Sequence, residues 1–413
     1  IKLSAILMSF ALIAFPFGLS LILNSHAHLI EWELAFLGHL PINVSIIFDG
    51  TALIFSTTVL IISANVFLFA QDYIKSEPHI HRFIHLLTLF VLSINAVIFC
   101  PNLIIILLGW DGLGTVSFLL VIYYHTPSTL AGGIITALTN RIGDVALVIG
   151  IATTITTAHW NIPLLTPSTP LLFATLLAAI TKSAQFPFSP WLPIAIAAPT
   201  PVSALVHSST LVTAGVYLLI RLAPTLQQIP LFSPTLLIVR ALTILIAALT
   251  ALLEMDIKKI VAYSTLSQLG VIIIALGLNS PQLALFHLLT HAIFKALLFI
   301  CVGTYIHYHQ HNQDLRTVGN LNTHLPLTQA ATTISNLALI GTPFLAAFYS
   351  KDPIIELTKT SPTNIIISIL FLTATALTAT YTARATLIRQ LGIPQQSPLL
   401  NPNNSSHSFT LPT

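Results

Sequence analysis

Long apolar runs separated by short polar segments follow one another along almost the whole chain. Most runs are about twenty residues long, the length of helix that crosses the hydrocarbon core of a bilayer. They lack the alternation of apolar and polar positions that marks a half-buried strand. We therefore expect about twelve transmembrane spans, at residues 3–23, 51–70, 83–100, 102–124, 129–158, 171–197, 201–220, 235–252, 258–277, 283–306, 328–350 and 362–390.

The length of these runs decides the fold class. In hydrocarbon every backbone N–H and C=O group needs a partner within the chain, and runs of this length without strand-like alternation exclude a β-barrel. The predicted fold is all-α, a polytopic transmembrane helix bundle. Two spans contain breaks: three prolines follow Lys182 in span 171–197, and Gly341-Thr342-Pro343 interrupts span 328–350. Proline removes a backbone donor, so both spans are predicted to be broken helices.

The positions of the two breaks predict an internal duplication. We expect N-terminal transmembrane helices at 1–82, a first five-helix repeat at 83–220, a second at 235–390 and a polar tail at 391–413. The broken helix is the fourth span of each repeat. In transporters, broken helices at corresponding positions of two halves mark the ion site.

Composition agrees with a membrane protein and narrows its partners. Of 413 residues, 55% are hydrophobic and 7% are charged, whereas about a quarter of a soluble domain is charged. The net charge of +3 comes without a basic run, which excludes nucleic acid as a partner. Loop lysines and arginines follow even-numbered spans, whereas loop 24–50 carries only acidic charges, so the even loops are expected on the inner side.

Several charged residues fall inside the predicted spans. A charge at the bilayer centre costs about 2.5–3.5 kcal/mol, so such a residue normally faces the protein interior or water. Asp111, Lys182, His207 and Lys295 are predicted at similar depth near the middle of their spans. Their presence points to proton or cation movement, although a structural buried ion pair at Asp111 is an alternative.

Asp111 and Lys182 are predicted to form a pair. Three glycines surround Asp111, which lets another helix approach its carboxylate. Burial favours the neutral form of a lysine and a nearby carboxylate favours the charged form, so separating the two groups would release a proton.

A second polar row is predicted on one helix face. His287, His291 and Lys295 recur every four residues, and Lys351 follows the second break. Histidine titrates near neutral pH, which suits a proton relay. The histidines lack the cysteines or carboxylates of a metal site at ligand spacing, so no metal is expected.

These residues lie in motifs that resemble the chain 5 family of mitochondrial NADH-ubiquinone oxidoreductase, the antiporter-like proton-pumping subunits of respiratory complex I. The resemblance covers nearly the whole chain and rests on seven motifs in order. They are Gly109-Trp110-Asp111-Gly112, Asn140-Arg141-Ile142-Gly143-Asp144, Lys182-Ser183-Ala184-Gln185, Pro199-Thr200-Pro201-Val202-Ser203-Ala204 with His207-Ser208-Ser209-Thr210, Asp256-Ile257-Lys258-Lys259, Thr290-His291-Ala292 with Phe294-Lys295-Ala296, and Phe348-Tyr349-Ser350-Lys351-Asp352.

The resemblance implies a subunit that translocates protons across the mitochondrial inner membrane, driven by NADH-to-ubiquinone electron transfer elsewhere in the complex. It implies two inverted repeats, partner subunits that include a neighbouring antiporter-like subunit, and lipid contacts. NADH, FMN, iron–sulfur clusters and ubiquinone would bind to other subunits, with no cofactor in this chain. The family's first helix and its C-terminal lateral helix have no counterpart in the sequence. The implied proton path comprises Asp111, Lys182, His207, Lys295 and Lys351, with Asp144, His287, His291 and Asp352 as further relay residues.

Two other functions share these features. A stand-alone sodium/proton antiporter would have the same fold and the same lysines, and it would exchange cations when reconstituted alone. A structural membrane anchor would need no charges at the middle of its spans. Partner dependence of transport separates the first alternative from a complex I subunit.

Overall fold

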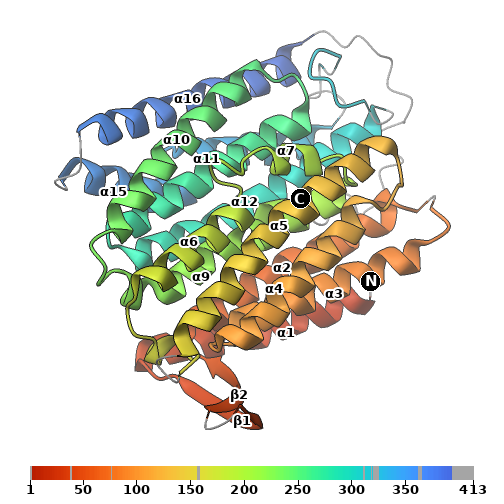
Figure 1. Cartoon of the computed structure of the whole chain (residues 1–413). Helices are drawn as coiled ribbons and strands as arrows, with labels where there is room; N and C mark the ends of the chain where they lie inside the picture. The colour runs from red at the N-terminus through yellow and green to blue at the C-terminus, as the bar shows by residue number, and fades with distance from the viewer. Residues whose placement is uncertain are drawn as a thin grey trace.

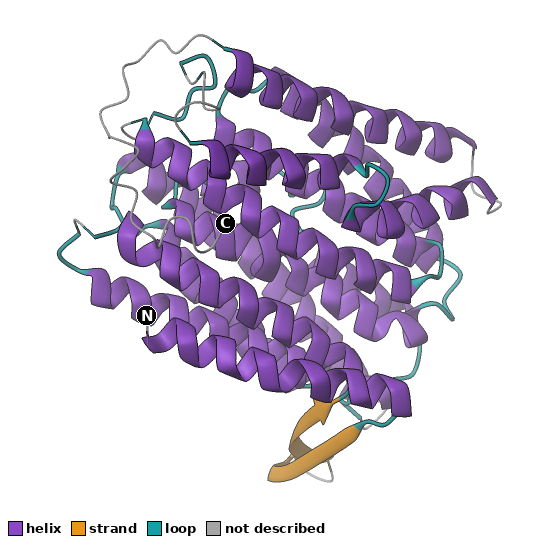
Figure 2. Cartoon of the chain, turned by 180° about the vertical axis from the view of Figure 1, so that it is seen from behind, coloured by secondary structure: helices purple, strands orange, loops and turns teal. Residues whose placement is uncertain are grey.

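The computed structural model describes residues 2–37, 40–75, 77–155, 159–309, 312–317, 319, 325–360 and 365–392. Its helices form one bundle, seen from opposite sides in Figure 1 and Figure 2. Within these residues, ten helical stretches are long and apolar enough to cross a membrane. They are α1 (Lys2–Asn24), α2 (Gly50–Tyr73), α3 (Ile80–Phe99), α4 (Leu103–Val121), α5 (Pro127–Thr154), the continuous stretch α8 (Thr200–Val202), η3 (Ser203–Thr210) and α9 (Leu211–Leu226), then α10 (Phe232–Leu253), α11 (Ile257–Gly277), α12 (Pro281–Tyr308) and α16 (Ile365–Leu391).

The other two predicted spans are broken helices, as expected. In the first, α6 (Thr169–Lys182) ends at the predicted lysine, and the short helix α7 (Trp191–Ala195) follows the prolines. In the second, α14 (Pro326–Ile340) is separated from α15 (Ala346–Thr360) by five residues. The helical membrane fold predicted from the sequence is confirmed. The division into repeats at 83–220 and 235–390 stays a prediction, with one break in each.

The two breaks are closed differently. At the first, the Trp191 indole Nε1–H at the start of α7 donates to the Thr181 carbonyl at the end of α6, 3.0 Å away. At the second, Gly341 has φ +93° and its N–H lies 3.1 Å from the carbonyls of both Leu337 and Ala338. This is the left-handed glycine cap that ends many helices. The first break thus adds a side-chain hydrogen bond to its backbone closure, in which the Gln185 N–H donates to the Ile180 carbonyl at 3.0 Å, whereas the second is capped by the backbone of Gly341.

Residues 28–37 and 40–48 form the two strands of a β-hairpin, in a segment that was predicted to be a loop. Strand β1 (His28–Leu37) pairs antiparallel with β2 (Leu40–Phe48), and the hairpin projects from one end of the bundle (Figure 1). Asn102 Nδ2 donates to the Asn43 carbonyl at 2.9 Å, and Asn161 Nδ2 donates to Glu31 Oε1 at 2.9 Å. The hairpin is thus tied to the residue that precedes α4 and to the segment that follows α5.

An ion pair ties the N-terminal helices to α9 beside the hairpin. Asp49 accepts the Ala52 N–H at the start of α2 and binds the Arg221 guanidinium through both oxygens, at 2.5 and 2.8 Å. Partial burial raises the pKa of the Asp49 carboxyl, but Arg221 and the other donors outweigh burial and hold the pKa below its usual value. The carboxylate is therefore charged at neutral pH.

The helices differ in how deeply they lie in the bundle. In α11, 94% of the apolar stretch is buried, compared with 17% in α1, so α11 is central and α1 lies at the edge. Close approach of α6 and α9 depends on Gly215, where an added Cβ would come within 2.8 Å of the Ala179 carbonyl oxygen. Broken helix α6 is thereby held against the core.

Candidate proton path

Of the ionisable residues that the sequence predicted for a proton path, Asp144 is buried at 7% exposure and six more are buried almost completely. These six are Lys182, His207, His287, His291, Lys295 and Lys351, and each has at most 2% of its surface exposed. They belong to α6, η3, α12 and α15. Because an uncompensated buried charge is very unfavourable, the partners of each residue decide what the cluster can do.

Lys182 points from the end of α6 toward α4. Its Nζ donates to the Trp110 carbonyl at 3.1 Å and lies 5.1 Å from the centre of the Trp110 indole ring. Gly114 leaves room for the ammonium group, since a Cβ there would lie 3.4 Å from Nζ. One face of α4 therefore forms the lysine pocket, with a carbonyl and an aromatic ring as neutral partners.

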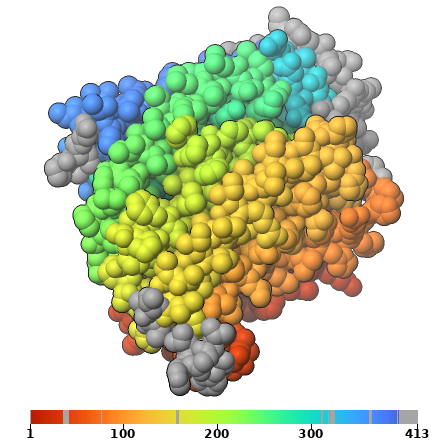
Figure 3. All heavy atoms as spheres, in the orientation of Figure 1, coloured from red at the N-terminus to blue at the C-terminus, as the bar shows by residue number. Residues whose placement is uncertain are grey.

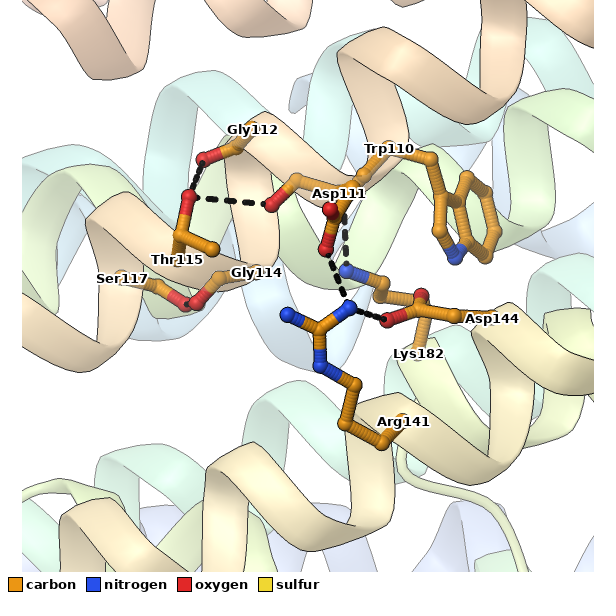
Figure 4. Close-up of polar contacts among 9 residues, drawn as sticks. All are labelled: Trp110, Asp111, Gly112, Gly114, Thr115, Ser117, Arg141, Asp144 and Lys182. Atoms are coloured by element: carbon orange, nitrogen blue, oxygen red, sulfur yellow. Dashed lines mark hydrogen bonds and ion pairs between the residues drawn. The ribbon is translucent and has the colours of Figure 1, made fainter.

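The carboxylates near Lys182 share an arginine (Figure 4). Arg141 Nη1 lies 2.8 Å from Asp111 Oδ1 and 3.5 Å from Asp144 Oδ2. The predicted direct pair of Asp111 with Lys182 is wrong: among the described residues the ion pair of Asp111 is with Arg141. Lys182 interacts electrostatically with Asp144 first, then with Asp111 and Arg141. The charged unit consists of two carboxylates, one arginine and one lysine.

The two carboxylates differ in exposure. The Asp144 side chain is 10% exposed, whereas those of Asp111 and Arg141 are 44% and 58% exposed. The latter two belong to α4 and α5, two helices whose colours run across the face shown in Figure 3. Asp144 therefore lies on the core side of the arginine and Asp111 on the surface side.

His207 lies in η3, a π-helix of eight residues, Ser203–Thr210. Its ring centre is 6.3 Å from that of Trp191, the residue that closes the break after α6. Sequence periodicity did not predict this π-helix. π-Helical turns occur frequently at functional sites, and here one places an imidazole beside the first broken helix.

The polar row of α12 makes contacts with α11 and α15. Lys295 Nζ donates to the Ser264 hydroxyl on α11 in a short hydrogen bond. The ring centres of His287 and His291 are 6.4 Å apart, one turn of the helix. His287 Nδ1 lies 2.8 Å from Ser350 Oγ on α15. The row thus reaches from the bundle centre to the second broken helix.

Lys351 lies on α15 directly after the second break. Its Nζ donates to the Ile340 carbonyl at 3.3 Å and to the Thr378 hydroxyl at 3.4 Å. Asp352 is the next residue, is partly buried, and interacts electrostatically with the lysine. A broken helix frees carbonyls at its end, and Lys351 satisfies one of them at Ile340.

Sequence reasoning missed several polar residues of the interior. Lys258 was placed at the first position of span 258–277, beside a loop, yet it is 4% exposed, and its Nζ donates to the Ala198 carbonyl at 3.3 Å. Arg240 on α10 is fully buried. Arg141 was noted only within a motif, although its spacing of three residues from Asp144 on a helix indicated a contact. Gln268 and Ser350, the partners of His287, carried no signal as uncharged residues.

Metal-binding groups are not evident in the part of the chain that the structure describes. It holds no group of three or more His, Cys, Asp or Glu residues placed to bind a metal ion. Cys100 and Cys301 are free thiols.

Two family models match the chain. The model described as "NADH:quinone oxidoreductase/Mrp antiporter, TM" matches residues 100–378, and that of "NADH-Ubiquinone oxidoreductase (complex I), chain 5 N-terminus" matches residues 32–84. The chain is 51% identical over 387 residues to NADH-ubiquinone oxidoreductase chain 5 of Lumbricus terrestris, which covers 93% of this chain and 67% of the relative. It is 46% identical over 407 residues to NADH-ubiquinone oxidoreductase chain 5 of Anopheles gambiae, and the match covers 97% of this chain and 70% of that relative.

Solved structures share the fold. A chain of the Mrp complex from Dietzia sp. superposes with a TM-score of 0.84 at 26% identity, covering all of this chain and 48% of that one. A chain of an archaeal membrane-bound sulfane sulfur reductase superposes with a TM-score of 0.82 at 22% identity, covering 99% of this chain and 86% of that one, a likeness of fold alone.

Proposed function

The chain belongs to the family of NADH-ubiquinone oxidoreductase chain 5, and on this premise we propose that it carries protons across the membrane along its buried polar residues. It is a multi-pass subunit of the mitochondrial inner membrane and of complex I, the proton-translocating NADH:ubiquinone oxidoreductase. Electron transfer in other subunits supplies the energy. We expect NADH, FMN, iron–sulfur clusters and ubiquinone to bind there, and no cofactor to bind in this chain.

One observation carries this proposal: six ionisable side chains on α6, η3, α12 and α15 are almost completely buried in the interior of the bundle. Each buried amine or imidazole is unfavourable in a fold that apolar side chains could fill more stably. Ionisable residues at membrane depth usually line the path of an ion, and this supports the proposal. Hydroxyls at Ser264, Ser350 and Thr378 contact three of them and offer proton-conducting partners.

Arg141 supplies the switch in the first half. It is shared between Asp111 and Asp144, at 2.8 and 3.5 Å. When Arg141 pairs with Asp111 alone, Asp144 is free to stabilise the charged form of Lys182. When Arg141 moves onto Asp144, the buried lysine loses its counter-charge and gives up its proton to the path. The sequence suggested that Asp111 and Lys182 separate to release the proton. We propose instead that Arg141 moves between the two carboxylates.

The same pair indicates where a partner subunit docks. Asp111 and Arg141 are 44% and 58% exposed in the middle of α4 and α5, where lipid would otherwise surround them. An exposed charge at that depth costs several kcal/mol, so a protein surface covers it. We assign this face to the neighbouring antiporter-like subunit. Lipid tails cover the apolar face of α1, where Leu12 and Ile13 are each 70% exposed.

Lys295→Met tests the proposed function. In purified complex I reconstituted into liposomes, we expect the ratio of protons pumped to electrons transferred to fall, while NADH oxidation by an artificial acceptor is unchanged. Lys359→Met, at an exposed lysine of α15, is the matched control and should pump normally. An unchanged ratio in the Lys295 variant would show that protons do not pass through this chain's interior.

Cation/proton antiport is the second candidate function, favoured by the likeness to the Mrp complex at a TM-score of 0.84. The chain reconstituted alone would then exchange sodium for protons across a vesicle membrane. For a complex I subunit we expect transport only in the assembled, NADH-oxidising complex, and sodium-driven proton exchange by the isolated chain would reverse the choice.

A further inference from the structure

We propose that Gln268 is a positioning residue that keeps a proton on Nε2 of His287, so that Nδ1 exchanges protons with Ser350. Ser350 would then connect the histidine row of α12 to the second broken helix. The inference rests on the proposed proton path and adds two uncharged residues to it, with a definite role for each.

His287 is held at both ring nitrogens by side chains from two different helices. Nε2 lies 3.3 Å from Gln268 Oε1 on α11, and Nδ1 lies 2.8 Å from Ser350 Oγ on α15. All three residues are fully buried. Ser350 also reaches Thr290 Oγ1 at 3.3 Å and the Ala347 carbonyl at 3.4 Å, so its hydroxyl has alternative partners when it turns.

The chemistry of the amide oxygen decides which nitrogen carries the proton. Gln268 Oε1 only accepts hydrogen bonds, so Nε2 must be the N–H that donates to it. In neutral His287, Nδ1 then has a free lone pair facing Ser350. The tautomer of a histidine is commonly fixed in this way by the partner of its other nitrogen.

A balanced proton transfer follows from this arrangement. A proton that arrives from the side of the second broken helix adds to Ser350 Oγ. At the same time the original hydroxyl proton of Ser350 transfers to Nδ1 of His287. The Ser350 hydroxyl is regenerated, the His287 ring becomes an imidazolium, and neither residue is oxidised or reduced. In the opposite tautomer Nδ1–H would donate to Ser350, and His287 could not accept a proton from that side.

The charged groups around His287 determine when it gives up the proton. Lys351 follows Ser350 on α15 and interacts electrostatically with the ring, and His291 lies one turn along α12. Lys295 stands one further turn along. A proton on Lys351 or His291 disfavours one on His287, so single charges pass along the row in sequence.

Two substitutions of Gln268 in the complete reconstituted complex test the inference. Gln268→Met keeps the shape and removes the acceptor, and we expect proton pumping to fall about two- to tenfold, the effect of one neutral hydrogen bond. Gln268→Glu keeps an acceptor oxygen. The negative charge of the glutamate stabilises the imidazolium of His287, so pumping persists. The pH at which the pumping rate is half-maximal moves up by about one unit or more.

Gln329→Met is the matched control. Gln329 is also buried and accepts the Tyr305 hydroxyl at 2.9 Å, but it lies on α14 away from His287. This variant should pump normally with an unchanged pH midpoint. Oxidation of NADH by an artificial acceptor reports the amount of assembled complex in each variant.

The outcomes separate the inference from the function beneath it. Normal pumping by Gln268→Met, or a pH midpoint unchanged or lowered in Gln268→Glu, overturns the positioning role. If Lys295→Met lowers pumping in the same assay, the proposed function stands even though the role of Gln268 is overturned. If Lys295→Met pumps normally as well, the proposed function itself fails.

Discussion

Each broken helix holds a buried lysine, Lys182 before the first break and Lys351 after the second, and the two are surrounded by different chemistry. Lys182 lies beside carboxylates, with Asp144 its strongest electrostatic partner, and beside the Trp110 carbonyl and ring. Lys351 binds a backbone carbonyl and the Thr378 hydroxyl, and its acidic neighbour is the adjacent Asp352. The first lysine lies near charged side chains of two other helices, α4 and α5, whereas the second is hydrogen-bonded to neutral oxygens.

This difference assigns different tasks to the two sites. A lysine beside opposite charges can be switched by moving those charges, and Arg141 is placed to move between two carboxylates. A lysine among hydroxyls and histidines has neutral partners that pass a proton on. The first break is therefore suited to driving the proton and the second to conducting it.

The largest expected effect comes from removing each lysine in turn. Lys182→Met removes a positive charge that interacts with Asp144 in the core, while Arg141 stays 3.5 Å from that carboxylate, so we expect lost pumping and a stability loss of about 2 kcal/mol, within the range for a buried charged group that loses one partner. Lys351→Met leaves two neutral oxygens and the partly exposed Asp352, so pumping falls while stability changes by less than about 1.5 kcal/mol. Thermal unfolding and pumping of both variant complexes measure this, and equal stability losses would erase the contrast.

A double-mutant cycle sharpens the contrast between the two sites. For Asp144→Asn with Lys182→Met we expect a coupling of about 1–2 kcal/mol in transport rate or stability. Asp352→Asn with Lys351→Met should couple by less than about 0.5 kcal/mol, because Asp352 is partly exposed and screened. If Asp352 and Lys351 couple as strongly as Asp144 and Lys182, then the second break also depends on an interaction between charged side chains.

The smallest expected effects concern how each break is closed. Trp191→Phe leaves the Thr181 carbonyl without its indole donor, at a cost of about 1–2 kcal/mol. Gly341→Ala forces a left-handed residue with a Cβ, which costs about 1 kcal/mol. Because Trp191 also contacts the His207 ring, the first variant should lower pumping and the second should not. Pumping that falls equally in both would contradict this division.

Hydropathy was sufficient to predict the helical fold, because a bilayer permits few alternatives. Twenty-residue apolar runs and proline clusters located the spans and both breaks. The β-hairpin was missed, although Ile30, Trp32 and Leu34 alternate with Glu31 and Glu33 as a strand requires. In that segment the acidic charges were used for topology and the alternation was overlooked.

The site was predicted residue by residue, but its pairings were not. Ionisable residues at membrane depth are conspicuous in a sequence with 7% charged residues. Which of them touch depends on helix rotation, which hydropathy does not determine. Asp111 was therefore assigned to Lys182, when its partner is Arg141 on α5. Contacts of neutral residues such as Gln268 depend on packing in three dimensions alone.

The π-helix Ser203–Thr210 has a consequence for how this chain tolerates insertions and deletions. A hydrogen bond from i to i+5 encloses one residue more than an α-helical bond, so the segment holds an extra residue that the flanking helix turns do not need. Deleting one residue within it would restore α-helical bonding and rotate everything before the deletion by about 100° relative to α9. Pro201 of the adjoining α8 would then face another direction. The length of this segment is fixed by geometry, even where its individual side chains are replaceable.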